Sequence, residues 1–197
     1  MALIAAVLWI VGTVVGRLAY AALHPEAEVW TQLTGNDVIA VTAALMSLGL
    51  FFYTRRRDRD PERVLTLGLW WLVVTAFDLG LITHWFPPTG APLDPIISWA
   101  GAVVLIYAAI VPTPPRKLLV LGLIVASMQP IGMVIARARG IWSFASPFDA
   151  LLMHHPDYLL VGVATVIAHV VTRLGQHVSK AREMGSYHLG ELLGRGG

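Results

Sequence analysis

The residues best placed to do chemistry in this chain are two charges that lie within apolar stretches. Arg17 and Asp78 are each surrounded in sequence by hydrophobic residues. A charged side chain inside a bilayer is costly unless it is paired, so such a residue is by default a functional candidate. We predict that Arg17 and Asp78 form an intramembrane polar pair that fixes helix register. A proton or ion pathway is the alternative, for which two groups are few.

Histidines form the second candidate set. His24, His84, His154 and His155 all fall near the ends of apolar stretches. Gathered imidazoles can bind a metal ion, but their spacing matches no recognised ligand pattern, and we predict no metal site. His169, inside the last apolar stretch, is expected to be packed and neutral rather than a haem ligand. The sequence contains no catalytic Ser–His–Asp order and no HExxH run, and without cysteine it has no disulfide or thiolate site.

The composition predicts the elements that must position these residues. Of the 197 residues, 56% are hydrophobic and only 13% are charged, against roughly 25% charged in a soluble domain. The mean hydropathy is +0.69. These values exclude a disordered chain, a collagen-like chain and a water-soluble globule. We therefore predict an all-α integral membrane protein, with the lipid bilayer as its first partner.

Six apolar stretches approach the roughly 20 residues that a helix needs to cross the hydrocarbon core. They are Ala2–Leu23, Asp37–Tyr53, Val64–Trp85, Ile96–Val111, Leu118–Ala138 and Tyr158–Leu174. Residues 1–175 are thus expected to form a six-helix transmembrane region. A cleavable signal peptide ending near Ala21 is the alternative interpretation of the first stretch, and it would remove one span.

Capping residues mark where these helices are expected to begin. A capping side chain followed by proline is typical of a helix start, because proline has no N–H to leave unpaired. Such pairs are Asp60-Pro61, Asp94-Pro95 and Thr113-Pro114, while Asn36-Asp37 and Asp157 fit as caps of the second and sixth stretches. Ser146-Pro147 predicts a short interfacial helix over residues 148–153. Pro130, inside the fifth stretch, predicts a bend there.

Basic residues predict the orientation. Eleven lie between the second and third stretches, between the fourth and fifth, or after the sixth: Arg55, Arg56, Arg57, Arg59, Arg63, Arg116, Lys117, Arg173, Lys180, Arg182 and Arg195. The opposite side has only Arg137 and Arg139. The positive-inside rule then predicts that both termini are cytoplasmic. This distribution favours membrane orientation over nucleic-acid binding as the meaning of a pI near 9.2.

Two patterns are compatible with helix association. Gly12 and Gly16 form a small-residue pair that permits close approach of another helix. After the last stretch, Leu174, Val178 and Ala181 fall on one helical face. We predict that this stretch continues as a helical linker over residues 176–185 that ends at Gly185. A homodimer through Gly12 and Gly16, a homodimer through the Leu174, Val178 and Ala181 face, and a solvated linker all fit these patterns.

The tail carries the most specific motif. Residues 182–197 read Arg-Glu-Met-Gly-Ser-Tyr-x-Leu-x-Glu-x-Leu-Gly-x-Gly-Gly. This run resembles the entry into the catalytic domain of bacterial serine/threonine protein kinases. The whole chain is similar to the multispan membrane region that precedes that domain in some of these kinases. Pro114–Lys117 and the join Val178–Tyr187 are typical of that arrangement.

The resemblance implies a truncated start of a kinase domain over residues 186–197, with its first strand and part of the Gly-rich loop. Leu193 would cover the adenine of ATP, and the backbone at Gly194, Gly196 and Gly197 would approach the phosphates. The catalytic lysine, aspartates and asparagine of the family are absent. This chain alone therefore should transfer no phosphate and need no cofactor. ATP and magnesium would serve the intact parent.

The predicted function is the membrane anchor, and candidate sensor, of a transmembrane serine/threonine protein kinase. The resemblance implies a multi-pass protein of the bacterial inner membrane, with the protein substrates of the missing catalytic domain as further partners. Two alternatives remain. One is a stand-alone six-helix transport or accessory protein, and the other is a receptor module that feeds a different signalling output. The residues that follow position 197 would discriminate among the three.

Overall fold

The protein is all-helical in the part of the chain that the structure describes. A computed structural model describes residues 2–23, 25, 30, 33–56, 60–85 and 93–185, and these contain no strand. They form the helices α1 (Ala2–Leu23), α2 (Gly35–Thr54), α3 (Pro61–Trp85), α4 (Trp99–Ile110), α5 (Pro115–Ala138), α6 (Pro147–Met153) and α7 (His155–Gly185). The short helix expected over residues 148–153 is confirmed as α6, and its interfacial position stays a prediction. The expected extension of the last helix as far as Gly185 is confirmed as α7.

Five of these helices, α1, α2, α3, α5 and α7, are long and apolar enough to cross a membrane. The structure therefore supports an all-α membrane protein. It does not confirm six full-length spans, because α4 has only 12 residues. A helix of that length rises about 18 Å, well short of a hydrocarbon core of about 30 Å.

The shortness of α4 has a local cause. The predicted helix start at Asp94-Pro95 was wrong, because the N-cap of α4 is Ser98. The hydroxyl of Ser98 accepts a hydrogen bond from the backbone N–H of Ala100 at 3.1 Å. Residues 93–98 are not helical. The N–H of Ile96 donates to the carbonyl of Met153 at 2.9 Å. Within a membrane, backbone outside a helix is tolerated only where other parts of the protein supply its hydrogen-bond partners.

Two helix starts show reciprocal caps. Thr34 is the N-cap of α2, so the predicted cap at Asn36-Asp37 was displaced by two residues. Asp37 occupies the third helical position, and its carboxylate accepts from both the N–H and the hydroxyl of Thr34 at 2.7 Å. The start of α6 follows the same pattern, with Ser146 and Asp149. In each case a short side chain satisfies backbone donors that the first turn leaves unpaired.

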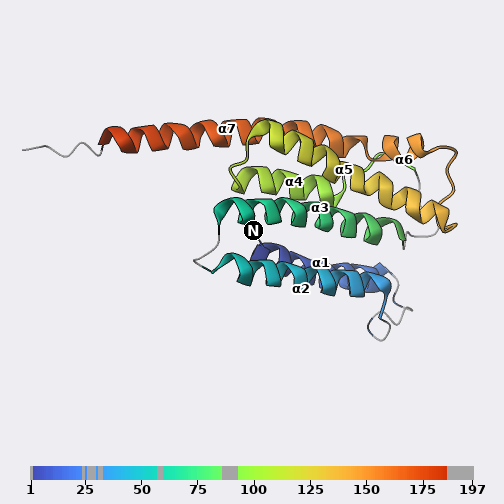
Figure 1. Cartoon of the computed structure of the whole chain (residues 1–197). Helices are drawn as coiled ribbons and strands as arrows, with labels where there is room; N and C mark the ends of the chain where they lie inside the picture. The colour runs from blue at the N-terminus through green and yellow to red at the C-terminus, as the bar shows by residue number, and fades with distance from the viewer. Residues whose placement is uncertain are drawn as a thin grey trace, which may run out of the picture.

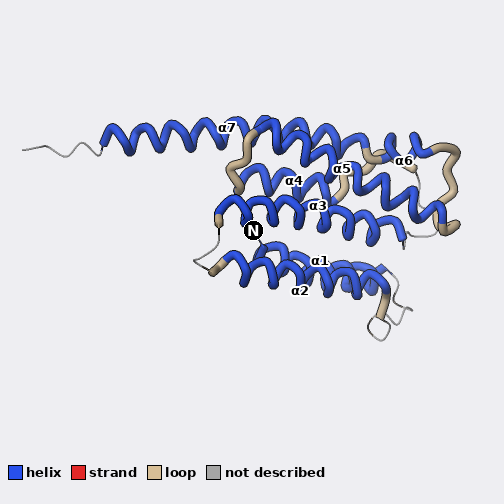
Figure 2. The backbone as a smooth tube through the Cα atoms, viewed as in Figure 1, coloured by secondary structure: helices blue, strands red, loops and turns tan. Residues whose placement is uncertain are grey.

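The helices stack in layers (Figures 1 and 2). A hairpin of α1 and α2 forms one layer, α3 follows it, and α4, α5 and α7 lie beyond α3. The beginning of α1 and the end of α7 lie on the same side of this bundle, which we call the tail end. We call the opposite side, where α3 and α5 end and α6 lies, the α6 end. Which of the two ends faces the cytoplasm stays a prediction.

The core lies among α3, α4, α5 and α7. Its largest buried side chains are Leu72, Val104, Tyr107, Leu118, Val125 and Val161. A second, smaller cluster joins Trp9 of α1 and three alanines of α2 to Leu79 and Ile82 of α3. Apart from Ala6 and Trp9, no residue of α1 is buried within the described chain. The described chain therefore leaves most of the surface of this apolar helix uncovered.

Two glycines allow α3 and α5 to touch through their backbones. A Cβ added at Gly80 would lie 2.7 Å from the carbonyl oxygen of Met128. A Cβ added at Gly132 would lie 2.8 Å from the carbonyl oxygen of Gly80. A Cβ at Gly12 or Gly16, the pair singled out in the sequence, would meet no described atom within 4 Å. Among the described residues, close approach of one helix backbone to another therefore occurs at Gly80 and Gly132. Self-association through Gly12 and Gly16 stays a prediction.

Candidate functional site

A group of polar side chains is fully buried at the α6 end. It comprises His84 near the end of α3, Gln129 of α5, His154 at the junction of α6 and α7, and Asp157 in the first turn of α7; each is 0% exposed. We call these four residues the histidine cluster. Asp157 does not cap α7 as predicted, because the helix already begins at His155. The turn at His154 instead places the carboxylate inside the protein.

The two imidazole rings and the carboxylate lie next to one another. The rings of His84 and His154 are nearly perpendicular, with centroids 4.9 Å apart. The Nδ1 atom of His154 lies 3.8 Å from Oδ2 of Asp157. The other carboxylate oxygen, Oδ1, accepts a hydrogen bond from the backbone N–H of Ser98 at 2.9 Å. Asp157 thereby connects the start of α7 to the non-helical segment before α4.

A tryptophan from the segment between α5 and α6 packs against the cluster. The indole N–H of Trp142 donates to the backbone carbonyl of His84 at 2.9 Å. Its ring meets the His84 ring edge-on, with centroids 5.8 Å apart. An indole N–H that is paired in this way can be buried without penalty. Trp142 therefore fixes the end of α3 against the chain that leads into α6.

Several polar atoms of the cluster have no hydrogen-bond partner of normal geometry in the protein. They are both ring nitrogens of His84 and of His154, both side-chain polar atoms of Gln129, and Oδ2 of Asp157. Buried polar groups are nearly always paired, and leaving one unpaired costs about 1–3 kcal/mol. A concentration of such atoms marks the cluster as the candidate site.

The structure brings together some of the predicted histidines and not others. His84 and His154 meet in the cluster, whereas His155 is exposed and its Nδ1 contacts the carbonyl of Leu152 at 2.8 Å. His24 lies outside the described residues. Within the described part of the chain, no three His, Asp or Glu side chains converge as a metal site requires. His169 is exposed on α7, not packed as predicted.

The second polar contact joins α1 to α2. Nε of Arg17 donates to Oδ1 of Asp37 at 3.0 Å, and Nη2 forms a second short bond with Oδ2. The predicted pair of Arg17 with Asp78 was therefore wrong. The hairpin places Asp37 beside Arg17, whereas Asp78 is half-buried on α3, deeper in the bundle. Sequence reasoning treated Asp37 only as a helix cap and so missed its role as the partner.

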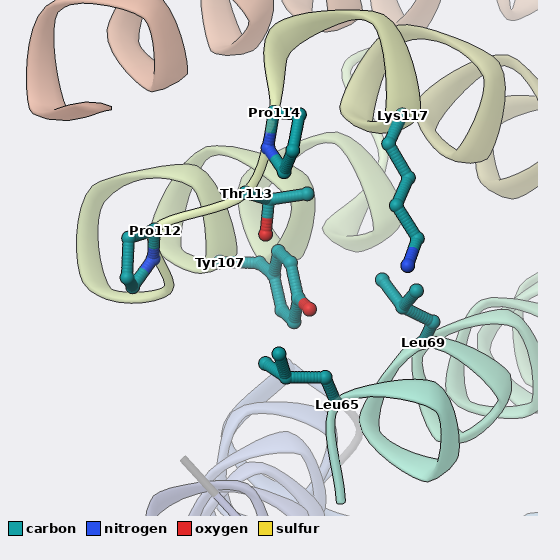
Figure 3. Close-up of a pocket in the computed structure, with 7 residues that line it drawn as sticks. All are labelled: Leu65, Leu69, Tyr107, Pro112, Thr113, Pro114 and Lys117. Atoms are coloured by element: carbon teal, nitrogen blue, oxygen red, sulfur yellow. The ribbon is translucent and has the colours of Figure 1, made fainter. Parts of the chain in front are cut away.

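A small cavity lies at the tail end (Figure 3). Its volume is about 30 Å³, the share of a single water molecule. The lining residues are Leu65, Leu69, Tyr107, Pro112, Thr113, Pro114 and Lys117. Because the cavity is so small and mostly apolar, it cannot hold a nucleotide or a molecule of similar size. It is part of the packing where α3, α4 and α5 meet.

No protein-family model, curated protein or solved structure matches the chain. The residues that carry the kinase resemblance most specifically, including Leu193, Gly194, Gly196 and Gly197, lie outside the described residues. The ATP-binding role that the resemblance implies for them therefore stays a prediction. The sequence did not single out Gln129 as a site residue, and it indicated Asp157 only as a cap.

Proposed function

We propose that this chain is the membrane region of a transmembrane serine/threonine protein kinase, in which it anchors the catalytic domain and senses a signal. The observation that carries the proposal is the course of α7. This helix begins in the histidine cluster and runs without interruption to Gly185, inside the join Val178–Tyr187 that is typical of such kinases. One rigid element thus leads from the candidate site to the start of the kinase-like tail.

The length of α7 supports this role. Its 31 residues correspond to about 46 Å of helix, more than the roughly 30 Å of a hydrocarbon core. From Arg173 to Ala181 every side chain is exposed, and the helix extends beyond the rest of the bundle (Figure 1). A helix that leaves the membrane in this way suits a connection to a domain in water. The exposed Leu174, Val178 and Ala181 offer a face for a second copy of the chain.

The distribution of charge supports a cytoplasmic tail end. Among the described residues, the basic side chains at the tail end are Arg55, Arg56, Arg63, Arg116, Lys117, Arg173 and Lys180. At the α6 end they are Arg17, which pairs with Asp37 at the start of α2, Arg137 and Arg139. The positive-inside rule then favours a cytoplasmic tail, where ATP and magnesium would reach the catalytic domain and its protein substrates. The membrane would be the bacterial inner membrane, with both termini inside.

Cysteine labelling tests this orientation directly, because the chain has no cysteine of its own. In intact bacterial spheroplasts, a membrane-impermeant maleimide should label Ser143→Cys, which is exposed at the α6 end. It should label Gln176→Cys, exposed on α7, only after the membrane is permeabilised. The unsubstituted chain is the control for background. Labelling of Gln176→Cys in intact spheroplasts would place the tail outside and exclude a cytoplasmic kinase domain.

The encoding DNA tests the kinase itself. We expect the reading frame after Gly197 to continue with Met-Gly-x-Val and, further on, Ala-x-Lys. The first completes the Gly-rich loop, and the second supplies the lysine that pairs with the ATP phosphates. Sequencing the gene is the measurement. A continuation that lacks both motifs would contradict the proposal.

One structural feature favours the second candidate, a stand-alone transport protein. Discontinuous helices often form the binding sites of transporters, and the non-helical residues 93–98 precede the short α4 beside the histidine cluster. A gene that stops after Gly197 together with an outward-facing tail would favour this function over the kinase.

A further inference from the structure

We propose that the histidine cluster is a proton-binding site, in which His154 and Asp157 together hold one proton at the start of α7. The ligand is the proton itself, and the site lies where α3, α5 and α7 meet. The inference rests on the geometry of the cluster, and it holds whether or not the chain is part of a kinase.

The first argument is charge balance. Asp157 is 0% exposed, its Oδ1 is occupied by the N–H of Ser98, and its Oδ2 has no partner. A buried carboxylate without a counter-charge is strongly destabilising. The titratable group placed to compensate it is His154, whose Nδ1 lies 3.8 Å away. One proton on this pair, carried by either residue, brings its net charge to zero.

The surrounding elements supply no fixed positive charge to replace that proton. His84 on α3 is the other titratable group facing the pair, while Gln129 on α5, Trp142 and the Ser98 backbone contribute only neutral groups. The arginines described at this end are engaged elsewhere. The guanidinium of Arg137 lies 4.7 Å from the ring centre of Phe144. The guanidinium of Arg139 lies 4.5 Å from the ring centre of Trp85.

The second argument is that a bound proton lets the donors and acceptors of the cluster pair with one another. A protonated His154 has two N–H donors. Nδ1 faces Oδ2 of Asp157, and the ring of His84, whose centroid lies 4.9 Å from that of His154, carries a further acceptor nitrogen. The remaining nitrogen of His84 can then pair with the Gln129 amide. Shortening the His154–Asp157 separation by about 1 Å, to the length of a charge-assisted hydrogen bond, would give Nδ1 of His154 and Oδ2 of Asp157 the partners that they lack.

The carboxylate is held where this contact can form. A Cβ at Gly101 of α4 would lie 2.6 Å from Oδ1 of Asp157, so a side chain at this position would displace the carboxylate. The Ser98 N–H fixes the same oxygen. Since Asp157 belongs to the first turn of α7, gain or loss of the proton changes how that turn is held against α3 and α4.

The test uses the full chain in lipid nanodiscs with ¹⁵N-labelled histidine. At about pH 6.5, near the ordinary range of histidine, we expect one bound proton on the pair. If His154 carries the proton, the ¹⁵N spectrum shows an imidazolium signal that is lost in His154→Gln. If Asp157 carries it, the infrared spectrum shows a protonated-carboxyl band that is lost in Asp157→Asn. The control is His155→Gln, an exposed neighbour outside the cluster, which should keep the wild-type spectrum. A neutral imidazole together with an ionised carboxylate in the wild-type chain would overturn the proposal.

Thermal unfolding gives a second readout. Above about pH 6.5 an ordinary histidine in the unfolded chain releases its proton, so a proton that the folded pair still holds stabilises the folded state, and this contribution is lost once the pH is high enough to remove it. We expect the thermal unfolding midpoint of the wild-type chain to exceed that of Asp157→Asn, and this difference to fall by about 3–8 °C between about pH 6 and pH 9. The His155→Gln control should follow wild type. An advantage that is unchanged by pH, or that requires added Zn²⁺, would overturn the proposal, the latter in favour of a metal site.

Discussion

Replacing Gly132 by valine should disrupt the contact between α3 and α5 and lower the free energy of unfolding by about 3 kcal/mol or more. Overpacking a core usually costs about 1–3 kcal/mol, because side chains and backbone must shift. Here the new Cβ would lie 2.8 Å from both the carbonyl carbon and the carbonyl oxygen of Gly80. Backbone atoms in the middle of a helix cannot rotate away as a side chain can. Thermal unfolding in detergent measures the loss.

The matched control for this experiment is Gly162→Val. Gly162 lies within α7, and a Cβ there meets no described atom within 4 Å. Both substitutions put the same β-branched residue into a helix, so their difference isolates the effect of the crossing. Equal losses in the two variants would show that α3 and α5 do not depend on a glycine contact.

Replacing Asp37 by alanine should give the second large effect, because one carboxylate serves two purposes. It accepts the reciprocal hydrogen bonds of Thr34 at the start of α2, and it pairs with Arg17 of α1. Loss of a helix cap alone costs about 1 kcal/mol, and loss of the ion pair with Arg17 adds to that cost. The expected result is a separation of α1 from α2, measured as a lower unfolding midpoint and as greater proteolysis between the two helices.

A double-mutant cycle separates the two purposes. Asp37→Asn keeps an acceptor for Thr34 but removes the charge, so it should destabilise the chain less than Asp37→Ala. In a chain that already carries Arg17→Met, Asp37→Asn should have almost no further effect, since the pair is already broken. Strict additivity of the two substitutions would mean that Arg17 and Asp37 do not interact.

Much of the fold could be predicted from the sequence, because long apolar stretches fix the existence of a membrane helix. The bounds of α1 and the ends of α3 and α5 agree with the prediction to the residue, since caps, charges and prolines mark them. The fourth span failed for a different reason. Residues 96–98 are apolar enough for a helix, but the N–H of Ile96 binds the carbonyl of Met153 and the N–H of Ser98 binds the carboxylate of Asp157. Such long-range partners leave no local signal.

The candidate site was less predictable than the fold. His84, Gln129 and Asp157 lie on three different helices, and no spacing within a single helix reveals that they meet. The Arg17 pair was assigned to Asp78 because both residues lie deep in apolar stretches. That depth was the wrong criterion, because the packing of α1 against α2 places Asp37 beside Arg17.

The uninterrupted course of α7 gives the molecule a lever arm. A tilt of about 5° about its first turn would displace the far end of a 31-residue helix by roughly 4 Å. That displacement exceeds the about 1 Å closure required between His154 and Asp157. A small rearrangement at the first turn of α7 would thus reach the tail magnified several-fold.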